Sequence, residues 1–407
     1  MRILVLTPSL PLPAMWGFNI RVFNILRELA TRNSVSLLCY GDPRADADSI
    51  RQLGEICDHV YVVPHVHRSP AQRRLEQAAT TLSFRSFHLH RFVTDAMQAQ
   101  LGQVLRGGGY DAVQVESSAM AMFDFGRTPV ILDEHNLEFE LLRRSNTVER
   151  SPLRRLFGSI ESRKVEREED SLWRRVAGCV VTSDREQVIV DLAAPGVPTE
   201  VVPNGVALEH FRPRGTAVAE GSIVFTGLMT YRPNADGVRH FVTQILPRIR
   251  RTRPDAVFTA VGWGLPADVR PLLGNGVIHT GRVDDIRPYL AKAAVVVVPL
   301  RIGSGTRLKV LEALAMGKAV VTTSIGCEGL AVEHERHVLI ADDPVEFATA
   351  VLRLLADRDE AAGLGRRGRE LVERLYGWDA VAARLASFHQ SLLGNRSLLA
   401  PSAVGAV

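Results

Sequence analysis

The alternation of short β-branched runs with longer helical patterns is the feature that most constrains how this chain can fold. Runs rich in valine and isoleucine recur along the whole sequence, and segments with helical spacing of apolar residues separate them. Parallel strands need a long crossover connection, usually a helix, so this alternation is typical of βα units. The sequence therefore predicts an α/β protein with parallel sheets.

The alternation occurs in two series, which indicates two domains. A chain of 407 residues is too long for one ordinary core. We predict strands of the first domain at 3–7, 34–38, 60–63, 112–115, 130–132, 179–182 and 200–204. Those of the second are predicted at 223–226, 256–261, 277–279, 295–299, 319–322 and 338–340.

The predicted hinge between the domains lies at 211–215, where Phe-Arg-Pro-Arg-Gly breaks the pattern. We therefore expect a first domain at 1–210 and a second at 211–378. A helix at 379–394 is expected to cross back to the first domain. The small, aperiodic residues 395–407 are expected to be disordered.

Composition places the chain among globular enzymes, with 46% hydrophobic and 23% charged residues. The first residues lack the longer apolar core of a signal peptide, and no stretch has the length of a transmembrane helix. The four cysteines lie far apart, which favours a reducing compartment and argues against zinc binding. A cytoplasmic location is expected.

Basic residues crowd two parts of the first domain, 65–91 and 143–167, with apolar residues between them. A solvated helical face is the simpler interpretation. The alternative is peripheral contact with an anionic membrane at its inner face. A net charge of only +4 and the lack of any recognisable nucleic-acid-binding module argue against a nucleic acid partner.

Ligands of open α/β sheets bind beyond the carboxyl ends of the strands, which directs attention to the strand-to-helix loops. The first loop ends in Gly17 at a helix start, where backbone amides could meet an anion or a sugar hydroxyl, although a plain turn is equally consistent. His135 follows the fifth strand and places a titratable ring at its carboxyl end. Gly227 follows the first strand of the second domain, with Arg232 shortly after it.

A glycine-rich turn after the strand at 295–299 gives the strongest indication of a ligand. Glycines let the backbone approach a diphosphate closely, and the amides at a helix start favour negative charge. Cations on the following helix would neutralise phosphates, and a carboxylate further along could accept ribose hydroxyls. The residues expected to hold a nucleotide here are Gly303, Ser304, Gly305, Thr306, Arg307, Lys309 and Glu312.

The run GSGTRLKVLEALAMG at 303–317, followed by AVVTT at 319–323 and GCEG at 326–329, resembles glycosyltransferase family 4. Three further landmarks agree in order: Pro203-Asn-Gly-Val206, Tyr231-Arg-Pro-Asn234 and Tyr376-Gly-Trp378. The resemblance implies a GT-B architecture, with two Rossmann-like domains facing across a cleft. It implies that the acceptor binds the first domain and the donor the second.

The resemblance also assigns roles to residues. Glu312 matches the second glutamate of the family's paired motif, which binds ribose, whereas Ser304 stands where the first is expected. Only Arg232 follows Gly227, so phosphate charge is expected to come mainly from the cations near the glycine-rich turn. Further correspondences are Gly17 in the first glycine loop, followed by Phe18 where the family often has a second glycine, His135 as the donor-side histidine, and Arg282 and Val283 beside the base.

Taken together, these features predict a retaining, metal-independent glycosyltransferase without a cofactor. Its donor would be a UDP-, GDP- or other nucleoside diphosphate sugar, and its acceptor a glycan, a lipid-linked molecule or a small molecule. The predicted catalytic residues are His135, Arg307 and Lys309.

Other functions are compatible with part of these features. A sugar-nucleotide 2-epimerase of related fold is one alternative, and an inactive sugar-binding protein, favoured by Ser304, is the other. A metal-binding D-x-D at Asp46 and Asp48 has no companion ligand in the sequence. A nicotinamide dehydrogenase would need the glycines that the first loop lacks.

Overall fold

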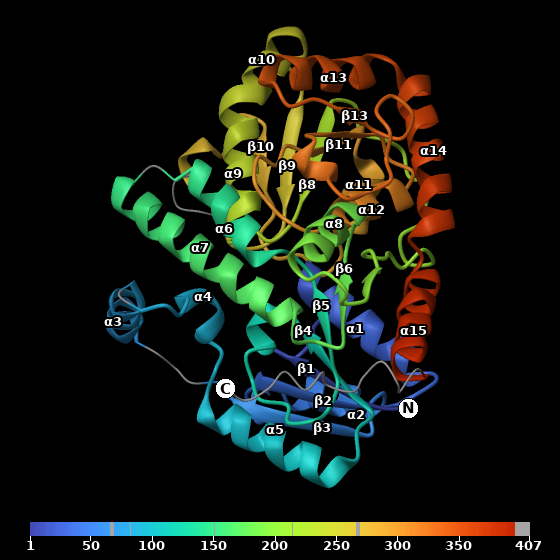
Figure 1. Cartoon of the computed structure of the whole chain (residues 1–407). Coiled ribbons are helices and arrows are strands. Elements are labelled where there is room, and N and C mark those ends of the chain that lie inside the picture. Colours follow the sequence, from blue (N-terminus) through green and yellow to red (C-terminus); the bar gives the residue numbers. More distant parts are fainter. Residues whose placement is uncertain (66–68, 82, 150, 214, 266–268, 395–407) are drawn as a thin grey trace. The chain divides into compact units, whose positions relative to one another are not determined.

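The computed structural model describes residues 1–65, 69–81, 83–149, 151–213, 215–265 and 269–394. The chain divides into two compact units, each with its own sheet (Figure 1). The first comprises Met1–Pro203 together with Val381–Val407, and the second comprises Asn204–Ala380. The boundary therefore falls earlier than the hinge predicted at 211–215. The tail at 395–407, predicted to be disordered, lies outside the described residues.

The first unit is built on a seven-stranded parallel sheet with the order β3-β2-β1-β4-β5-β6-β7. Its strands are β1 Arg2–Thr7, β2 Ser34–Gly41, β3 His59–Pro64, β4 Ala112–Glu116, β5 Val130–Glu134, β6 Gly178–Val181 and β7 Thr199–Val201. Every strand predicted for this half is present. The last strand is shorter than predicted, and it ends two residues before Pro203, which has no N–H to donate to a ladder.

Helices pack around this sheet, which is why its central strands are continuous apolar runs. They are α1 Gly17–Ala30, α2 Ala47–Gly54, α3 Pro70–Thr81, α4 Phe87–His90, α5 Asp95–Gly108, α6 Glu138–Thr147, α7 Pro152–Trp173 and α8 Asp184–Ala193, with a 3-10 turn η1 at Ser118–Met120. The buried apolar face of α1 consists of Val22, Ile25, Leu26 and Leu29. Polar residues share this buried side, among them Arg21.

The second unit has a six-stranded parallel sheet with the order β10-β9-β8-β11-β12-β13. Its strands are β8 Ser222–Thr226, β9 Val257–Val261, β10 Val277–His279, β11 Val295–Val298, β12 Val320–Thr322 and β13 Leu339–Ile340. Its helices are α9 Arg232–His240, η2 Phe241–Ile245, α10 Leu246–Thr252, η3 Arg270–Leu272, α11 Arg287–Lys292, α12 Leu308–Ala315, η4 Ile325–Cys327, α13 Pro344–Ala356 and α14 Arg358–Leu375. All six strands predicted for this half are present, and the predicted α/β class is confirmed.

The last helix, α15, spans Trp378–Gly394, and its residues from Val381 onward belong to the first unit. Phe388 and Leu392 pack directly on Gly178 at the start of β6, where an added Cβ would lie 2.5 Å from Leu392 Cδ1. Among the described residues, no helix is both long and apolar enough to cross a bilayer.

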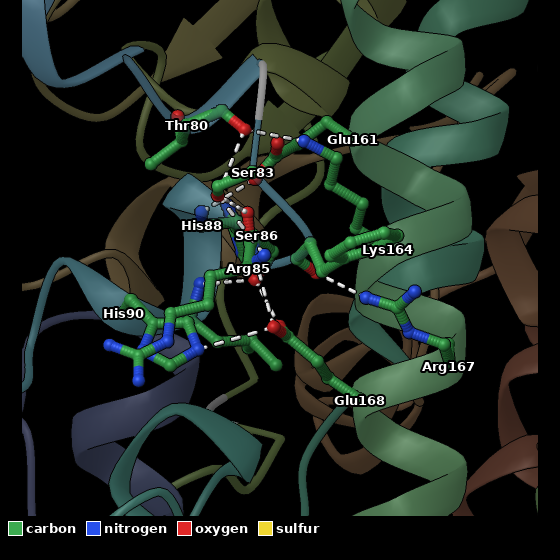
Figure 2. Close-up of polar contacts among 12 residues, drawn as sticks. Thr80, Ser83, Arg85, Ser86, His88, His90, Glu161, Lys164, Arg167 and Glu168 are labelled. Atoms are coloured by element: carbon green, nitrogen blue, oxygen red, sulfur yellow. Dashed lines mark hydrogen bonds and ion pairs between the residues drawn. The ribbon is translucent and has the colours of Figure 1, made fainter.

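Side chains of helix α7 form hydrogen bonds with the segment that joins α3 to α4, as Figure 2 shows. Lys164 Nζ donates to the carbonyl of Thr80 at 2.6 Å, and the Arg167 guanidinium donates to the carbonyl of Phe84. Glu168 accepts from the backbone amide of Ser86 at 3.0 Å and from its hydroxyl.

The same stripe of α7 holds the short helix α4. Glu161 accepts from the backbone amide of His88 at 2.7 Å, and Glu168 also pairs with His90 Nε2 at 3.2 Å (Figure 2). These contacts come from side chains three, four or seven positions apart, which share one helix face. The first basic stretch of the sequence is thus attached to the second by directed polar contacts.

Candidate functional site

The order of the second sheet reverses between β8 and β11, the position where open α/β sheets bind ligands. Gly227 directly follows β8, and the glycine-rich turn at 303–306 lies between β11 and α12. Since the carboxyl ends of these paired parallel strands share one sheet edge, the structure brings the two predicted loops together.

Lys309 reaches from α12 to the loop after β8. Its ammonium donates to Asn234 Oδ1 at 2.6 Å and lies 4.1 Å from the centre of the Phe225 ring. Gly227 has φ of +151°, and a Cβ there would stand 2.7 Å from Lys309 Nζ. A glycine is therefore required where the cation meets the backbone. The sequence pointed to Gly227 and Lys309 but not to Asn234 as the partner that holds the ammonium.

Burial brings the pKa values of two charged groups on α12 toward each other. It lowers the pKa of Lys309 to about 7 and raises the pKa of Glu312 to about 7, an effect that the charge of Lys309 opposes. Desolvation disfavours the charged form of each group, so a ligand that supplies opposite charge or hydrogen bonds would change their protonation. The charges of Lys309 and Glu312 thus influence each other.

Arg307 has a different position from the one expected. It is the residue before α12 and not part of the helix, and its guanidinium turns back to donate to the carbonyl oxygens of Ser304 and Gly305. Gly303, with φ of +149°, lies against it, since a Cβ there would be 2.5 Å from Arg307 Nη2. Arg307 therefore stabilises the backbone of the glycine-rich turn.

The segment Pro203-Asn-Gly-Val206 also stabilises the glycine-rich turn. Asn204 Nδ2 donates to the carbonyl of Thr306 at 3.1 Å. This contact could not be predicted from the sequence, because the two residues lie 102 positions apart. The backbone of the predicted nucleotide loop is thus held by side chains on both sides.

The other predicted donor residues lie along the same edge of the sheet. Arg232 is the first residue of α9 and is exposed, and Arg282 and Val283 lie on the loop after β10. That loop is connected to the loop after β9 by a bridge between Gly281 and Gly262.

In the first unit, His135 immediately follows β5, and its ring is buried. Nε2 lies 2.6 Å from Oε2 of Glu116, the last residue of β4. The ring stacks on Phe18 with centroids 4.5 Å apart and planes inclined by 26°. Gly17, the first residue of α1, precedes Phe18, so the predicted first loop and His135 come together through this ring.

Beside this pair lies a buried ion pair between Arg21 and Asp133. Nη2 and Nε of Arg21 donate to the two Asp133 oxygens at 2.9 and 3.2 Å, and Nη1 donates to the carbonyl of Pro203 at 3.0 Å. Glu116, Asp133 and His135 offer three potential metal-ligand atoms within 4.8 Å of one another. Both Asp133 oxygens, however, are engaged by the Arg21 guanidinium.

Neither Glu116 nor Arg21 was predicted from the sequence. Glu116 could have been found as a carboxylate at the end of β4, the strand next to the one that His135 follows. The two acids of the D-x-D triplet lie elsewhere: Asp46 accepts from the backbone amide of Asp42 at 2.8 Å, and exposed Asp48 pairs with Arg51 at 3.0 Å.

The chain has two Rossmann-like units, each with a parallel sheet. A glycine-lined loop lies where the strand order of the second sheet reverses. Together these features define a protein of the GT-B fold. The computed structure matches that of sucrose-phosphate synthase from Thermosynechococcus elongatus with a TM-score of 0.72. This match covers 97% of the chain and 99% of the other protein at 19% identity, which establishes the fold. Residues 220–357 match the family described as Glycosyl transferases group 1.

Two relatives resemble the chain in sequence. The GDP-mannose-dependent alpha-(1-6)-phosphatidylinositol monomannoside mannosyltransferase of Mycobacterium tuberculosis is 31% identical over 220 residues, covering 48% of this chain and 56% of the relative. The lipopolysaccharide core biosynthesis mannosyltransferase LpcC of Rhizobium leguminosarum bv. viciae is 28% identical over 269 residues, covering 61% and 74%. The chain thus spans little more than half the length of the first of these relatives.

Proposed function

We propose that the chain is a retaining glycosyltransferase that moves a sugar from a nucleoside diphosphate sugar to an acceptor hydroxyl. The observation that carries this proposal is the Lys309 ammonium at Gly227, beside the glycine-rich turn that precedes α12. A cation, a turn that tolerates close backbone approach and a helix start together suit a diphosphate. Glu312, further along α12, is suited to the ribose.

The chemistry requires that negative charge on a leaving diphosphate be stabilised. The bond between the anomeric carbon and the phosphate oxygen breaks, and the nucleoside diphosphate leaves with the electron pair. The acceptor oxygen bonds to the anomeric carbon on the same face, and its proton passes to a phosphate oxygen. Lys309 and the amides near the start of α12 would stabilise the developing charge without a bound metal ion. The family resemblance assigns His135 to orienting the donor sugar.

The relatives suggest which donor to test first. Both of the sequence relatives described above are mannosyltransferases, and one is GDP-mannose-dependent. We therefore place GDP-mannose ahead of UDP-sugars as the candidate donor. Ser304, which stands where the family has a carboxylate, is the residue most suited to altering the choice of sugar.

A donor screen with purified protein tests this proposal. Release of nucleoside diphosphate is measured for GDP-mannose and UDP-sugars, with and without lipid-linked or soluble acceptors, and the glycoside product and its anomeric configuration are identified. Lys309→Met serves as the matched inactive variant. Nucleotide release without a glycoside would indicate an epimerase or hydrolase instead, and donor binding without turnover would indicate a sugar-binding protein. Activity lost with a chelator and restored by Mg²⁺ or Mn²⁺ would contradict metal independence.

The acceptor proposed here is lipid-linked and is reached at an anionic membrane surface. Large apolar side chains are exposed on the two basic stretches, including Phe84 at 83% and Leu153 at 81%. Leu156 is also exposed, and Arg154 and Arg155 lie between the two leucines. Exposed apolar side chains interleaved with cations are suited to an anionic interface.

Vesicle sedimentation tests the membrane proposal. Binding to anionic vesicles at low salt should weaken when Leu153 and Leu156 are both replaced by serine, and it should weaken with added salt. Leu192→Ser is the matched control, because Leu192 is also an exposed leucine but follows an acidic residue on α8. No binding of the parent protein at low salt would contradict membrane contact and favour a soluble acceptor.

A further inference from the structure

We infer that Glu116 is the positioning residue of His135: it fixes the rotation and the tautomer of the ring. This inference rests on the proposed role of His135 toward the donor sugar. Neither the family resemblance nor the sequence pattern had indicated Glu116.

The strand pairing places the carboxylate and the ring together. Glu116 is in register with Asp133 across β4 and β5, and His135 follows two positions later on the same side of the strand. One oxygen of Glu116, Oε2, lies 2.6 Å from His135 Nε2. The other, Oε1, accepts from Gln114 Nε2 at 2.8 Å, so the carboxylate is itself held in place.

A second contact restricts the ring in the other direction. Phe18 stacks on the imidazole at 4.5 Å between centroids, which fixes the plane of the ring, while Glu116 fixes its rotation within that plane. Both Glu116 and Gln114 are fully buried, so water does not compete for the carboxylate. The ring is thus preorganised before any ligand binds.

The hydrogen bond has a chemical consequence. An ionised carboxylate can only accept, so His135 Nε2 must carry the hydrogen. Glu116 therefore determines which ring nitrogen carries the hydrogen of the neutral imidazole and which carries the lone pair.

Other charged groups around the ring leave this role to Glu116. Asp133 on β5 is neutralised by Arg21 from α1. Glu138 on α6 is hydrogen-bonded to His88 Nε2 at 2.9 Å. Glu134, adjacent to His135 in the chain, lies on the opposite side of β5 and accepts from Ser118 and from Trp173 Nε1.

The test compares Glu116→Gln with the parent protein. The amide has nearly the same shape but can either accept from Nε2 or donate to it, so the share of the tautomer with hydrogen on Nε2, read from the ring nitrogen resonances by NMR, should fall. Because the ring is then no longer held in one state, kcat should fall by at least about tenfold. Glu116→Asp retains a group that only accepts and should restore part of the preference for the Nε2 tautomer.

Glu134→Gln is the matched control. It also replaces a fully buried carboxylate next to the site, but one that does not contact the ring, and it should leave the tautomer of His135 unchanged. Comparable thermal unfolding of the variants establishes that each is folded.

The outcomes separate this inference from the proposed function. An unchanged His135 tautomer in Glu116→Gln overturns the inference, as does a changed tautomer in an enzyme that keeps the kcat of the parent. If the parent protein transfers no sugar from any donor, the proposed function fails, and the NMR measurement of the tautomer still decides whether Glu116 controls the ring.

Discussion

The ammonium of Lys309 lies 2.6 Å from the side-chain oxygen of Asn234, and this contact links the start of α12 to the start of α9. The two residues lie 75 positions apart in the sequence. Because the contact places the cation against Gly227 and over the Phe225 ring, the ammonium is largely removed from water. That removal explains why burial lowers its pKa to about 7.

The first prediction is that the affinity for a nucleotide sugar has a maximum near neutral pH. Lys309, whose pKa burial lowers to about 7, loses its charge above that pH and binds the diphosphate less well. Glu312, whose pKa burial raises to about 7, takes up a proton below that pH and no longer accepts both ribose hydroxyls. On each side of the maximum, the affinity should fall by up to about tenfold per pH unit. Calorimetry with a nucleotide sugar measures this, because its diphosphate diester does not titrate near pH 7.

Two variants show which residue causes the loss of affinity on each side of the maximum. Glu312→Gln should remove the loss at low pH. Lys309→Met should remove the loss at high pH while weakening affinity at every pH. Since the charges of the two groups influence each other, each variant will also shift the pH at which the remaining loss occurs. A flat profile between pH 6 and 8 in the parent protein would show that neither group titrates on donor binding.

A second prediction distinguishes Arg307 from Lys309. The Arg307 guanidinium holds the carbonyls of Ser304 and Gly305, so Arg307→Ala should destabilise the second unit by about 2 to 4 kcal/mol as well as weakening nucleotide binding. Arg307→Lys should recover less than half of this loss, because an ammonium cannot reproduce the planar fork. Lys309→Met removes a cation that burial disfavours, and it should lower activity without lowering thermal stability.

Thermal unfolding and calorimetry on the three variants separate these roles. If Arg307→Ala unfolds at the parent's temperature and loses only kcat, the guanidinium acts on the departing diphosphate and the turn does not depend on it.

The strands and the glycine-rich turn could be predicted because their signals are local. Buried parallel strands are continuous apolar runs, such as Val295–Val298, and a glycine turn between a strand and a helix is visible in a few consecutive letters. The alternation of such runs with helical segments is also local, and it was sufficient to predict the α/β class.

The partners of the site residues could not be predicted, because they come from distant parts of the chain. Arg21 contacts Asp133 across 112 positions, and Lys309 contacts Asn234 across 75. A pattern of apolar residues also does not reveal buried polar residues on the same helix, such as Arg21. The cost of burying its charge is offset by the ion pair with Asp133. The direction of the Arg307 side chain depends on loop carbonyls that have no signature in the sequence.

A third prediction concerns the packing of α14 against the end of α12. A Cβ at Gly365 would collide with the carbonyl oxygen of Gly317, with the carbonyl carbon 2.7 Å away. Because backbone cannot swing aside as a side chain can, Gly365→Ala should cost about 1 to 3 kcal/mol or more. It should also weaken donor binding, since α12 carries Lys309 and Glu312.

Gly363→Ala is the control for this substitution within the same helix. Its nearest neighbours are the ends of two flexible arginines, with Arg367 Nη1 at 3.3 Å, so alanine should be neutral or stabilise by about 0.5 to 1 kcal/mol. Denaturant unfolding of both variants gives the comparison. Equal stability of the two would mean that α14 moves away from α12 at little cost.

The fourth prediction is that His389 makes the first unit sensitive to acid. Among the described residues, neither ring nitrogen of this fully buried histidine on α15 has a hydrogen-bond partner. Burial lowers its pKa to about 4, an effect that the charge of Asp133 opposes. The folded protein therefore keeps the ring neutral where the unfolded chain, with an ordinary pKa of about 6.5, takes up a proton. The free energy of unfolding should fall by about 3 kcal/mol as the pH drops from about 6.5 to about 4.

Two substitutions separate the charge of His389 from its polarity. His389→Leu removes both the titration and the unpartnered nitrogens, so it should flatten the pH dependence and raise stability at pH 7.5 by about 1 to 3 kcal/mol. His389→Gln cannot take up a proton but remains polar, so it should flatten the pH dependence with little gain at pH 7.5. Urea titrations at several pH values between 4.5 and 7.5 measure both effects. If both variants keep the parent's dependence on pH, the acid sensitivity comes from other groups, because His389 is the only titratable group that the two substitutions remove.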